Sequence, residues 1–175
     1  SWQPVAGADR YVVLLGSEEY DSIDSEVGRH VLTGLTPGEQ HEVEVYAVNA
    51  SGAGASGKAV ILTLPDIVSD LSVDSIAQTT AHLSWAAKNG ANQYKVILNG
   101  QTYEVSGTTL DASSLIGGTE YRWTVAAGNG SGYGVTSEEN QFLTLPAAPD
   151  GIQVEKVTTS SVALSLPAVQ SATSY

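Results

Sequence analysis

A repeated stretch is the feature that most constrains how this chain can fold. Residues 115–132 resemble residues 35–52 at a constant offset of 80 positions, which aligns Leu115 with Leu35, Asn129 with Asn49 and Gly132 with Gly52. Self-similarity at a fixed period of this size is typical of an array of repeated structural units. The sequence therefore predicts a string of similar modules.

Recurring landmark pairs indicate where the modules begin and end. A tyrosine follows a large apolar residue by nine positions three times, at Trp2 and Tyr11, Trp85 and Tyr94, and Leu166 and Tyr175. These spacings predict a partial module at residues 1–64 that lacks its first strand, a complete module at 65–146, and the N-terminal part of a third at 147–175. Prolines follow the two junctions, and because proline restricts φ, the links are expected to be semi-rigid.

Short apolar–polar alternations in the complete module predict strands, not helices. Asn99-Gly100 separates two β-rich runs, which is typical of a hairpin with a type I′ turn. Seven strands are expected, near residues 71–76, 81–85, 94–98, 101–105, 108–112, 121–127 and 136–145. Residues 128–134 and the glycine-rich residues 52–57 are expected to be loops. The pattern predicts an all-β chain of sandwiches with a core built on Trp2, Tyr11, Leu35, Trp85, Tyr94, Leu115, Tyr121 and Trp123.

Charge and composition disfavour several classes of partner. The formal net charge is −12, and no cluster of Lys or Arg could follow a phosphate backbone, so nucleic acid is not an expected partner. No apolar run is long enough to span a bilayer, so membrane insertion is not expected either. The sequence contains no cysteine, which excludes disulfides and cysteine-ligated metals.

On these residues the modules resemble fibronectin type III modules. The features that carry the resemblance are a Trp on the second strand, a Tyr on the third, Leu-x-Pro-Gly before the longest strand and Val-x-Ala-x-Asn-x-x-Gly at its end. In the complete module they are Trp85, Tyr94, Leu115, Tyr121, Ala127, Asn129 and Gly132, with Gly117-Gly118 in place of Pro-Gly. His41 replaces the family's corner tyrosine in the first module, and Leu166 replaces its core tryptophan in the third.

The resemblance implies tandem immunoglobulin-like β-sandwiches of fibronectin type III topology. It also implies a spacer or interaction module, extracellular or at the cell surface, with no chemistry of its own and no cofactor.

Two motifs contain the residue types of ligand sites. Residues 52–57 match the G-x-G-x-x-G dinucleotide fingerprint, but a strand and not a helix is expected to follow, so no pyrophosphate site is predicted. The acidic loop with Asp21, Asp24 and Glu26 has alternating oxygen ligands that suit calcium, although the EF-hand pattern is missing. A solvated acidic loop is the favoured interpretation.

Two equivalent loops carry glycosylation sequons, at Asn49-Ala50-Ser51 and Asn129-Gly130-Ser131. Their positions suit glycan attachment in a secreted protein. The alternative is that each asparagine is a turn former that tolerates positive φ, and this alternative is favoured.

The favoured hypothesis is a non-catalytic structural or adhesive repeat segment of an extracellular surface protein, fibre or filament. Its expected partners are other copies or neighbouring modules of the same protein, and protein or carbohydrate ligands. The alternatives are spacer modules of a secreted polysaccharide-degrading enzyme, and a receptor-type ectodomain that binds protein through its loops. Further sequence or a neighbouring chain is expected to complete the open sheets, although the landmark repeated at residues 2–11 and 166–175 argues against a neat exchange between chain ends.

Overall fold

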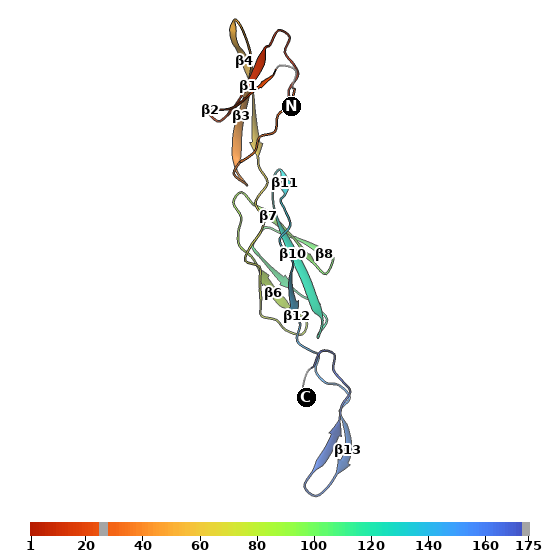
Figure 1. Cartoon of the computed structure of the whole chain (residues 1–175). Helices are drawn as coiled ribbons and strands as arrows, with labels where there is room; N and C mark the ends of the chain where they lie inside the picture. Colours follow the sequence, from red (N-terminus) through yellow and green to blue (C-terminus); the bar gives the residue numbers. More distant parts are fainter. Residues whose placement is uncertain (25–27, 173–175) are drawn as a thin grey trace. The chain divides into compact units, whose positions relative to one another are not determined.

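The computed structural model describes residues 1–24 and 28–172, and over these residues the chain is all-β with no helix (Figure 1). The fold class expected from the sequence is confirmed. The chain divides into two compact units, one made of Ser1–Asp66, Lys88–Ala91 and Gly128–Gly134, the other of Ile67–Ala87, Asn92–Ala127 and Val135–Tyr175.

The first unit is built on a four-stranded antiparallel sheet. Its strands are β1 (Arg10–Leu15), β2 (Glu18–Asp24), β3 (Gln40–Asn49) and β4 (Gly52–Leu62), in the order β2-β1-β3-β4. In the register of β1 and β3, Tyr11 lies opposite Ala47 and Val13 opposite Val45. These four apolar residues therefore point to one face of the sheet.

β4 differs from the expectation. Residues 52–57, predicted to be a loop, form the first half of this strand, and Asn49 pairs with Gly52 across a tight turn. The turn lies at residues 50–51 because the side-chain oxygen of Asn49 accepts a hydrogen bond from the backbone N–H of Ser51 (2.9 Å). The strand then runs on to Leu62, so no helix begins in the glycine-rich motif.

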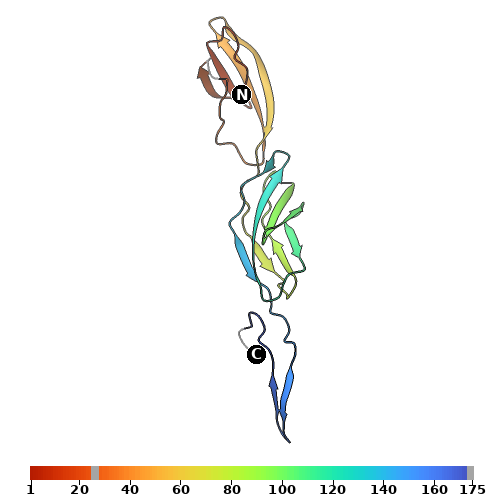
Figure 2. The same cartoon turned by 90° about the vertical axis from the view of Figure 1, so that its right-hand side faces the viewer.

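The second unit contains the strands of a complete sandwich, in two sheets (Figure 2). The smaller sheet has the order β5-β6-β9, and the larger has the order β11-β10-β7-β8 with β12 also paired to β10. The strands are β5 (Ser72–Asp74), β6 (Ala81–Ser84), β7 (Gln93–Leu98), β8 (Gln101–Val105), β9 (Thr109–Ala112), β10 (Glu120–Asn129) and β12 (Asn140–Leu143). The short β11 (Gly132–Tyr133), which pairs with the end of β10, falls among the residues grouped with the first unit.

The hairpin predicted at Asn99-Gly100 is confirmed. Leu98 pairs with Gln101, and φ is 45° at Asn99 and 82° at Gly100, which is the left-handed geometry that a type I′ turn requires. Asparagine and glycine adopt this region at the lowest steric cost, and for that reason the dipeptide fixes the register of β7 against β8.

The end of the sandwich differs from the expectation. The predicted closing strand at residues 136–145 is reduced to β12, and the predicted loop at 128–134 contains the end of β10 and all of β11. Ser137 explains the interruption. Its N–H donates to the carbonyl of Val125 (2.8 Å), while its hydroxyl accepts from the N–H of Val125 (2.9 Å) and so occupies the place of a backbone acceptor.

The core of the second unit lies between its two sheets. Leu83, Val96 and Val125 are 0 % exposed, and Trp123 is 1 % exposed. The Trp85 ring lies 6.1 Å from that of Trp123, in a tilted arrangement that is favourable for aromatic pairs. Apolar side chains from both sheets therefore exclude water from this core.

Strands β13 (Gln153–Val157) and β14 (Val162–Ser165) form a separate two-stranded hairpin in the C-terminal part of the chain. Val154 pairs with Leu164, and Val157 pairs with Val162. Their side chains are 56–67 % exposed, which is high for valine and leucine in strands.

Candidate functional site

The residues proposed as the core differ in burial between the two units. In the second unit Trp85, Tyr94, Leu115, Tyr121 and Trp123 are 1–9 % exposed. In the first unit Tyr11 is 1 % exposed, whereas Trp2 and Leu35 are only half-buried. Trp2 and Leu35 are therefore less covered than their counterparts Trp85 and Leu115.

A tyrosine closes one corner of the complete sandwich. The hydroxyl of Tyr121 accepts a hydrogen bond from the backbone N–H of Ile116 (2.9 Å), and its ring stacks on Phe142 at 5.5 Å. His41 occupies the equivalent place in the first unit, and its Nε2 lies 3.3 Å from the carbonyl oxygen of Thr36. Both side chains thus contact the backbone at equivalent positions, Ile116 and Thr36. The tyrosine contacts an N–H, and the histidine contacts a carbonyl.

An open apolar groove lies along one face of the β2-β1-β3-β4 sheet. It has a volume of about 590 Å³, and its lining includes Tyr11, Val13, Val43, Val45 and Ile61. Along β3 every residue from Val43 to Val48 is only half-buried, whereas in the second unit β10 is buried from Val125 to Ala127. The groove is the face that a second sheet covers in a complete sandwich.

The two sequon asparagines lie in equivalent turns. The side-chain oxygen of Asn129 accepts from the N–H of Ser131 at 2.9 Å, the same contact and distance that Asn49 makes with Ser51. Asn49 is exposed, but Asn129 is 3 % exposed and donates its amide N–H to the carbonyl of Thr63 (2.8 Å), within the first compact unit. Glycosylation at either position stays a prediction, and Asn49 is the more accessible acceptor.

The acidic segment predicted as a loop differs from the expectation, because Asp21 and Asp24 lie in strand β2 and pair with β1. A histidine contacts this strand. The carboxylate of Asp21 lies 3.1 Å from Nε2 of His30, and its other oxygen accepts from the N–H of Ser22 (2.7 Å). Asp24 is exposed at the end of β2, and Glu26 lies outside the described residues. Within residues 1–24 and 28–172, no three His, Asp or Glu side chains form a group that could hold a metal ion.

A row of ionisable residues crosses the smaller sheet of the second unit. Asp74 on β5 lies opposite His82 on β6, which lies opposite Asp111 on β9. His82 Nδ1 donates to the Asp111 carboxylate (2.5 Å), and chiefly through this hydrogen bond the pKa of His82 is raised above its ordinary value of 6.5. This row has no signature in the sequence, because only the strand register brings the three positions together.

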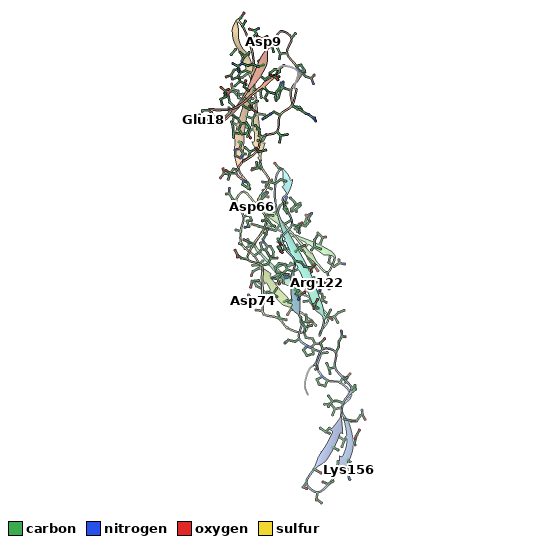
Figure 3. The ribbon with its side chains drawn as sticks, viewed as in Figure 1. Asp9, Glu18, Asp66, Asp74, Arg122 and Lys156 are labelled. Atoms are coloured by element: carbon green, nitrogen blue, oxygen red, sulfur yellow. The ribbon has the colours of Figure 1, made fainter. Side chains whose placement is uncertain are left out.

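The outer faces of the larger sheets carry exposed ion pairs. Arg122, labelled in Figure 3, donates hydrogen bonds to the carboxylates of Glu120 (3.1 Å) and Glu139 (3.0 Å). These hydrogen bonds raise the pKa of the arginine. Lys58 contacts Glu42 and Glu44 in the first unit. Such exposed pairs contribute little to stability, and they keep these faces solvated. In the described part of the chain there is no helix with the length and apolar character needed to cross a membrane.

The family comparison matches the second unit. The model of the fibronectin type III domain matches residues 66–142. The solved structure of a segment of two fibronectin type III domains from chicken tenascin is similar to this chain, with a TM-score of 0.52 and 19 % sequence identity. The match covers 81 % of this chain and 88 % of that segment. That likeness concerns the fold alone.

Two curated relatives cover different parts of the chain. Mouse tenascin-N is 28 % identical over 97 % of this chain, which corresponds to 12 % of the mouse protein. The tail tube protein gp17.1* of Bacillus phage SPP1 is 41 % identical over 37 % of this chain and 24 % of the phage protein. The chain thus spans a small fraction of the length of these relatives.

The family match covers the residues that form the sandwich of the second unit. They include its two sheets, its buried aromatic anchors and the corner at Tyr121. Residues 66–142 match the fibronectin type III domain, and their strand order is that of a two-sheet sandwich.

Proposed function

We propose that the chain is a non-catalytic structural or adhesive segment of an extracellular surface protein, fibre or filament. It would consist of modules at residues 1–64, 65–146 and 147–175, and it would act by spacing and by bearing load. Neighbouring modules, other copies, and protein or carbohydrate ligands are its proposed partners. The match to mouse tenascin-N over 97 % of the chain supports a tandem arrangement. The name of the phage relative, a tail tube protein, supports a place in an elongated assembly.

The observation that carries the proposal is how the first and last segments of the complete sandwich are joined. Asn140, at the start of β12, donates its side-chain N–H to the carbonyl of Leu71 before β5 (2.9 Å). Leu145, after β12, donates its backbone N–H to the carbonyl of Ala77 after β5 (3.2 Å). The two segments therefore run side by side in the same chain direction.

This direction matters under tension. A pull on residue 66 and on residue 146 draws the two segments in opposite directions along their own axes. The hydrogen bonds between the two segments then bear the load together. In a hairpin opened from its end, by contrast, the hydrogen bonds break one after another. A sandwich whose first and last segments are joined in this way resists extension through its non-covalent contacts alone.

Single-molecule extension of the 175-residue chain, held at its two ends, tests the proposal. Unfolding of residues 66–142 is expected as one discrete step of roughly 240 Å, from about 3.6 Å per extended residue less the length of the folded domain. Asn140→Ala removes one bridging bond and should lower the force of that step. Asn92→Ala, the same substitution at an exposed position before β7, should leave the force unchanged. Smooth extension without a step would contradict a load-bearing role.

A further inference from the structure

Strand β8 is an open edge of the complete sandwich in the second unit. It is the last strand in the order β11-β10-β7-β8, and it lies at the margin of its unit in both views (Figure 1, Figure 2). Among the strands that the structure describes, it pairs with β7 alone. Its residues from Gln101 to Glu104 are exposed. Free backbone N–H and C=O groups along such an edge are a template for another strand.

The turn before β8 determines which of its backbone groups are free. In a two-residue hairpin with a type I′ turn, the pair that flanks the turn is hydrogen-bonded, and here this pair includes Gln101. Hydrogen-bonded and non-hydrogen-bonded pairs alternate along an antiparallel ladder, so Tyr103 and Val105 also bond to β7. The N–H and C=O groups of Thr102 and Glu104 therefore point to the open edge. In the described part of the chain, no backbone hydrogen bond to a further element occupies them.

The equivalent edge of the first unit has features that prevent pairing, and β8 lacks them. β2 pairs with β1 as β8 pairs with β7. Four of the seven residues of β2 are acidic, and its register shifts at a bulge. Charged side chains and bulges keep edge strands from pairing with each other. β8 has a single acidic residue, Glu104, and its register runs without a shift.

The free groups of β8 complement those of a second copy in one symmetric register. When two copies of a strand pair antiparallel about a two-fold axis, the residue on the axis lies opposite itself. With Glu104 on the axis two carboxylates would oppose each other, which is destabilising. With Thr102 on the axis, Glu104 would lie opposite Gly100 in the turn. With Tyr103 on the axis, Thr102 of each copy lies opposite Glu104 of the other, and these pairs use all of the free groups.

The side chains of β8 also suit the register centred on Tyr103. Tyr103 is 37 % exposed and would contact its own copy in a non-hydrogen-bonded pair, the kind in which side chains lie closer and aromatic rings interact. On the opposite face, Glu104 lies next to Lys95 of β7 in the ladder. Its carboxylate would therefore lie between this cation and the hydroxyl of Thr102 of the second copy, and not beside another acid.

We infer that β8 is a pairing site for β8 of a second copy of this chain, joined antiparallel about Tyr103. The larger sheets of the two copies then form one continuous sheet. The same surface of each copy makes the contact, so the assembly closes as a dimer. Because only two five-residue strands meet, the interface is small and the dimer is weak.

Sedimentation equilibrium of the 175-residue chain from about 10 μM to about 1 mM tests the inference, because this range covers the affinity of a small interface. The wild-type chain is expected to show a monomer–dimer equilibrium. Added salt should favour the dimer, because each copy carries a net charge of −12 and the repulsion between copies is screened.

Charge substitutions at Thr102 test which residues lie opposite each other. Thr102→Glu places a second acid opposite Glu104 and should abolish the dimer, whereas Thr102→Lys places a cation there and should strengthen the dimer severalfold. Gln141→Glu and Gln141→Lys make the same charge changes at an exposed position of β12 and should alter the dimerisation constant far less.

A proline tests the role of the free backbone groups. Thr102→Pro removes an N–H that points to the open edge, and the ladder between β7 and β8 does not use this group. The dimer loses one hydrogen bond from each copy and should weaken about tenfold or more. Unchanged tryptophan fluorescence of the monomer checks that the fold is kept.

A cysteine on the axis tests the register directly. Tyr103→Cys places two thiols opposite each other at a Cα separation of about 4.5 Å, within the range that a disulfide accepts. The sequence has no other cysteine, so the bond must join two copies. In the matched control Thr102→Cys, the two cysteines are diagonal neighbours about 7–8 Å apart and should link much more slowly.

A wild-type chain that stays monomeric at about 1 mM, or that forms a dimer equally well with Thr102→Glu, would overturn the inference. Equal rates of disulfide formation at positions 102 and 103 would overturn the register. The proposed load-bearing role does not depend on this contact. That role stands if the chain is monomeric and unfolds in a discrete step under force, and it fails separately if the extension is smooth.

Discussion

Replacing Leu83 by alanine is the sharpest test of the core of the second unit. Leu83 is 0 % exposed on β6, where it lies opposite Leu110. The substitution loses the transfer free energy of the removed atoms and leaves a cavity that the surrounding sheets only partly fill. Fully buried leucines of this kind cost about 2.7–5.0 kcal/mol, so a loss of about 3 kcal/mol in the free energy of unfolding is expected. The matched control is Leu143→Ala on β12, where the side chain is 53 % exposed and the expected change is within about 0.5 kcal/mol.

Urea denaturation followed by tryptophan fluorescence measures the difference. Trp85 and Trp123 report on the second unit, and a Trp2→Phe background removes the signal of the first. With a typical urea slope of about 1–3 kcal/mol/M, Leu83→Ala should lower the midpoint by about 1–3 M. Measurements near 1 μM protein keep association between copies to a minimum. If Leu83→Ala and Leu143→Ala shifted the midpoint equally, packing between the two sheets would not be the source of stability.

Three further changes test separate parts of the fold. Tyr121→Phe leaves the N–H of Ile116 without its acceptor and should cost about 1–3 kcal/mol by the same urea assay, whereas an unchanged midpoint would show that the corner is dispensable. Gly100→Ala places a Cβ at a φ of 82° where no neighbouring atom lies within 4 Å, so only backbone strain of about 1–2 kcal/mol is expected, and a neutral result would contradict the type I′ assignment. Because the pKa of His82 is raised in the folded protein, its pairing with Asp111 stabilises fully below pH 6.5 and is lost as the pH rises through the raised pKa. The melting temperature should therefore fall over this interval in the wild type and less steeply in Asp111→Asn, and parallel pH profiles would refute the linkage.

Much of the complete sandwich could be predicted because local signals and tertiary packing agree there. The alternation along β10 marks Tyr121, Trp123 and Val125 as core residues, and each is 9 % exposed or less. Asn99-Gly100 determines its own turn, because few other dipeptides adopt positive φ twice at so low a cost. In such places the sequence pattern and the final structure depend on the same physical constraint.

The errors arose where a single side chain decided the backbone path. Glycine-rich residues 52–57 read as a loop, yet the hydrogen bond between Asn49 and Ser51 places the turn earlier and lets the strand begin at Gly52. The hydroxyl of Ser137 likewise interrupts the last strand of the sandwich. Neither contact has a periodic signature, so pattern analysis could not have found them.

The surface features depend on register, which the sequence does not show directly. Asp74, His82 and Asp111 are up to 37 positions apart and meet only because three strands align. The groove of the first unit is lined in part by Trp2 and Tyr11, which were predicted as core residues because of their apolar side chains. The groove is recognised as a candidate surface only when the first unit is compared with the complete sandwich of the second unit.

Amide hydrogen exchange across the whole 175-residue chain tests most directly the claim that one closed sandwich accompanies an open sheet. At a protein concentration near 1 μM, the amides of β10 from Tyr121 to Ala127 are expected to exchange only through global unfolding, with protection of at least about 10³-fold. Those of β3 from Val43 to Val48 should exchange markedly faster, because one face of that strand is open to water. Equal protection of β3 and β10 at this concentration would contradict the account.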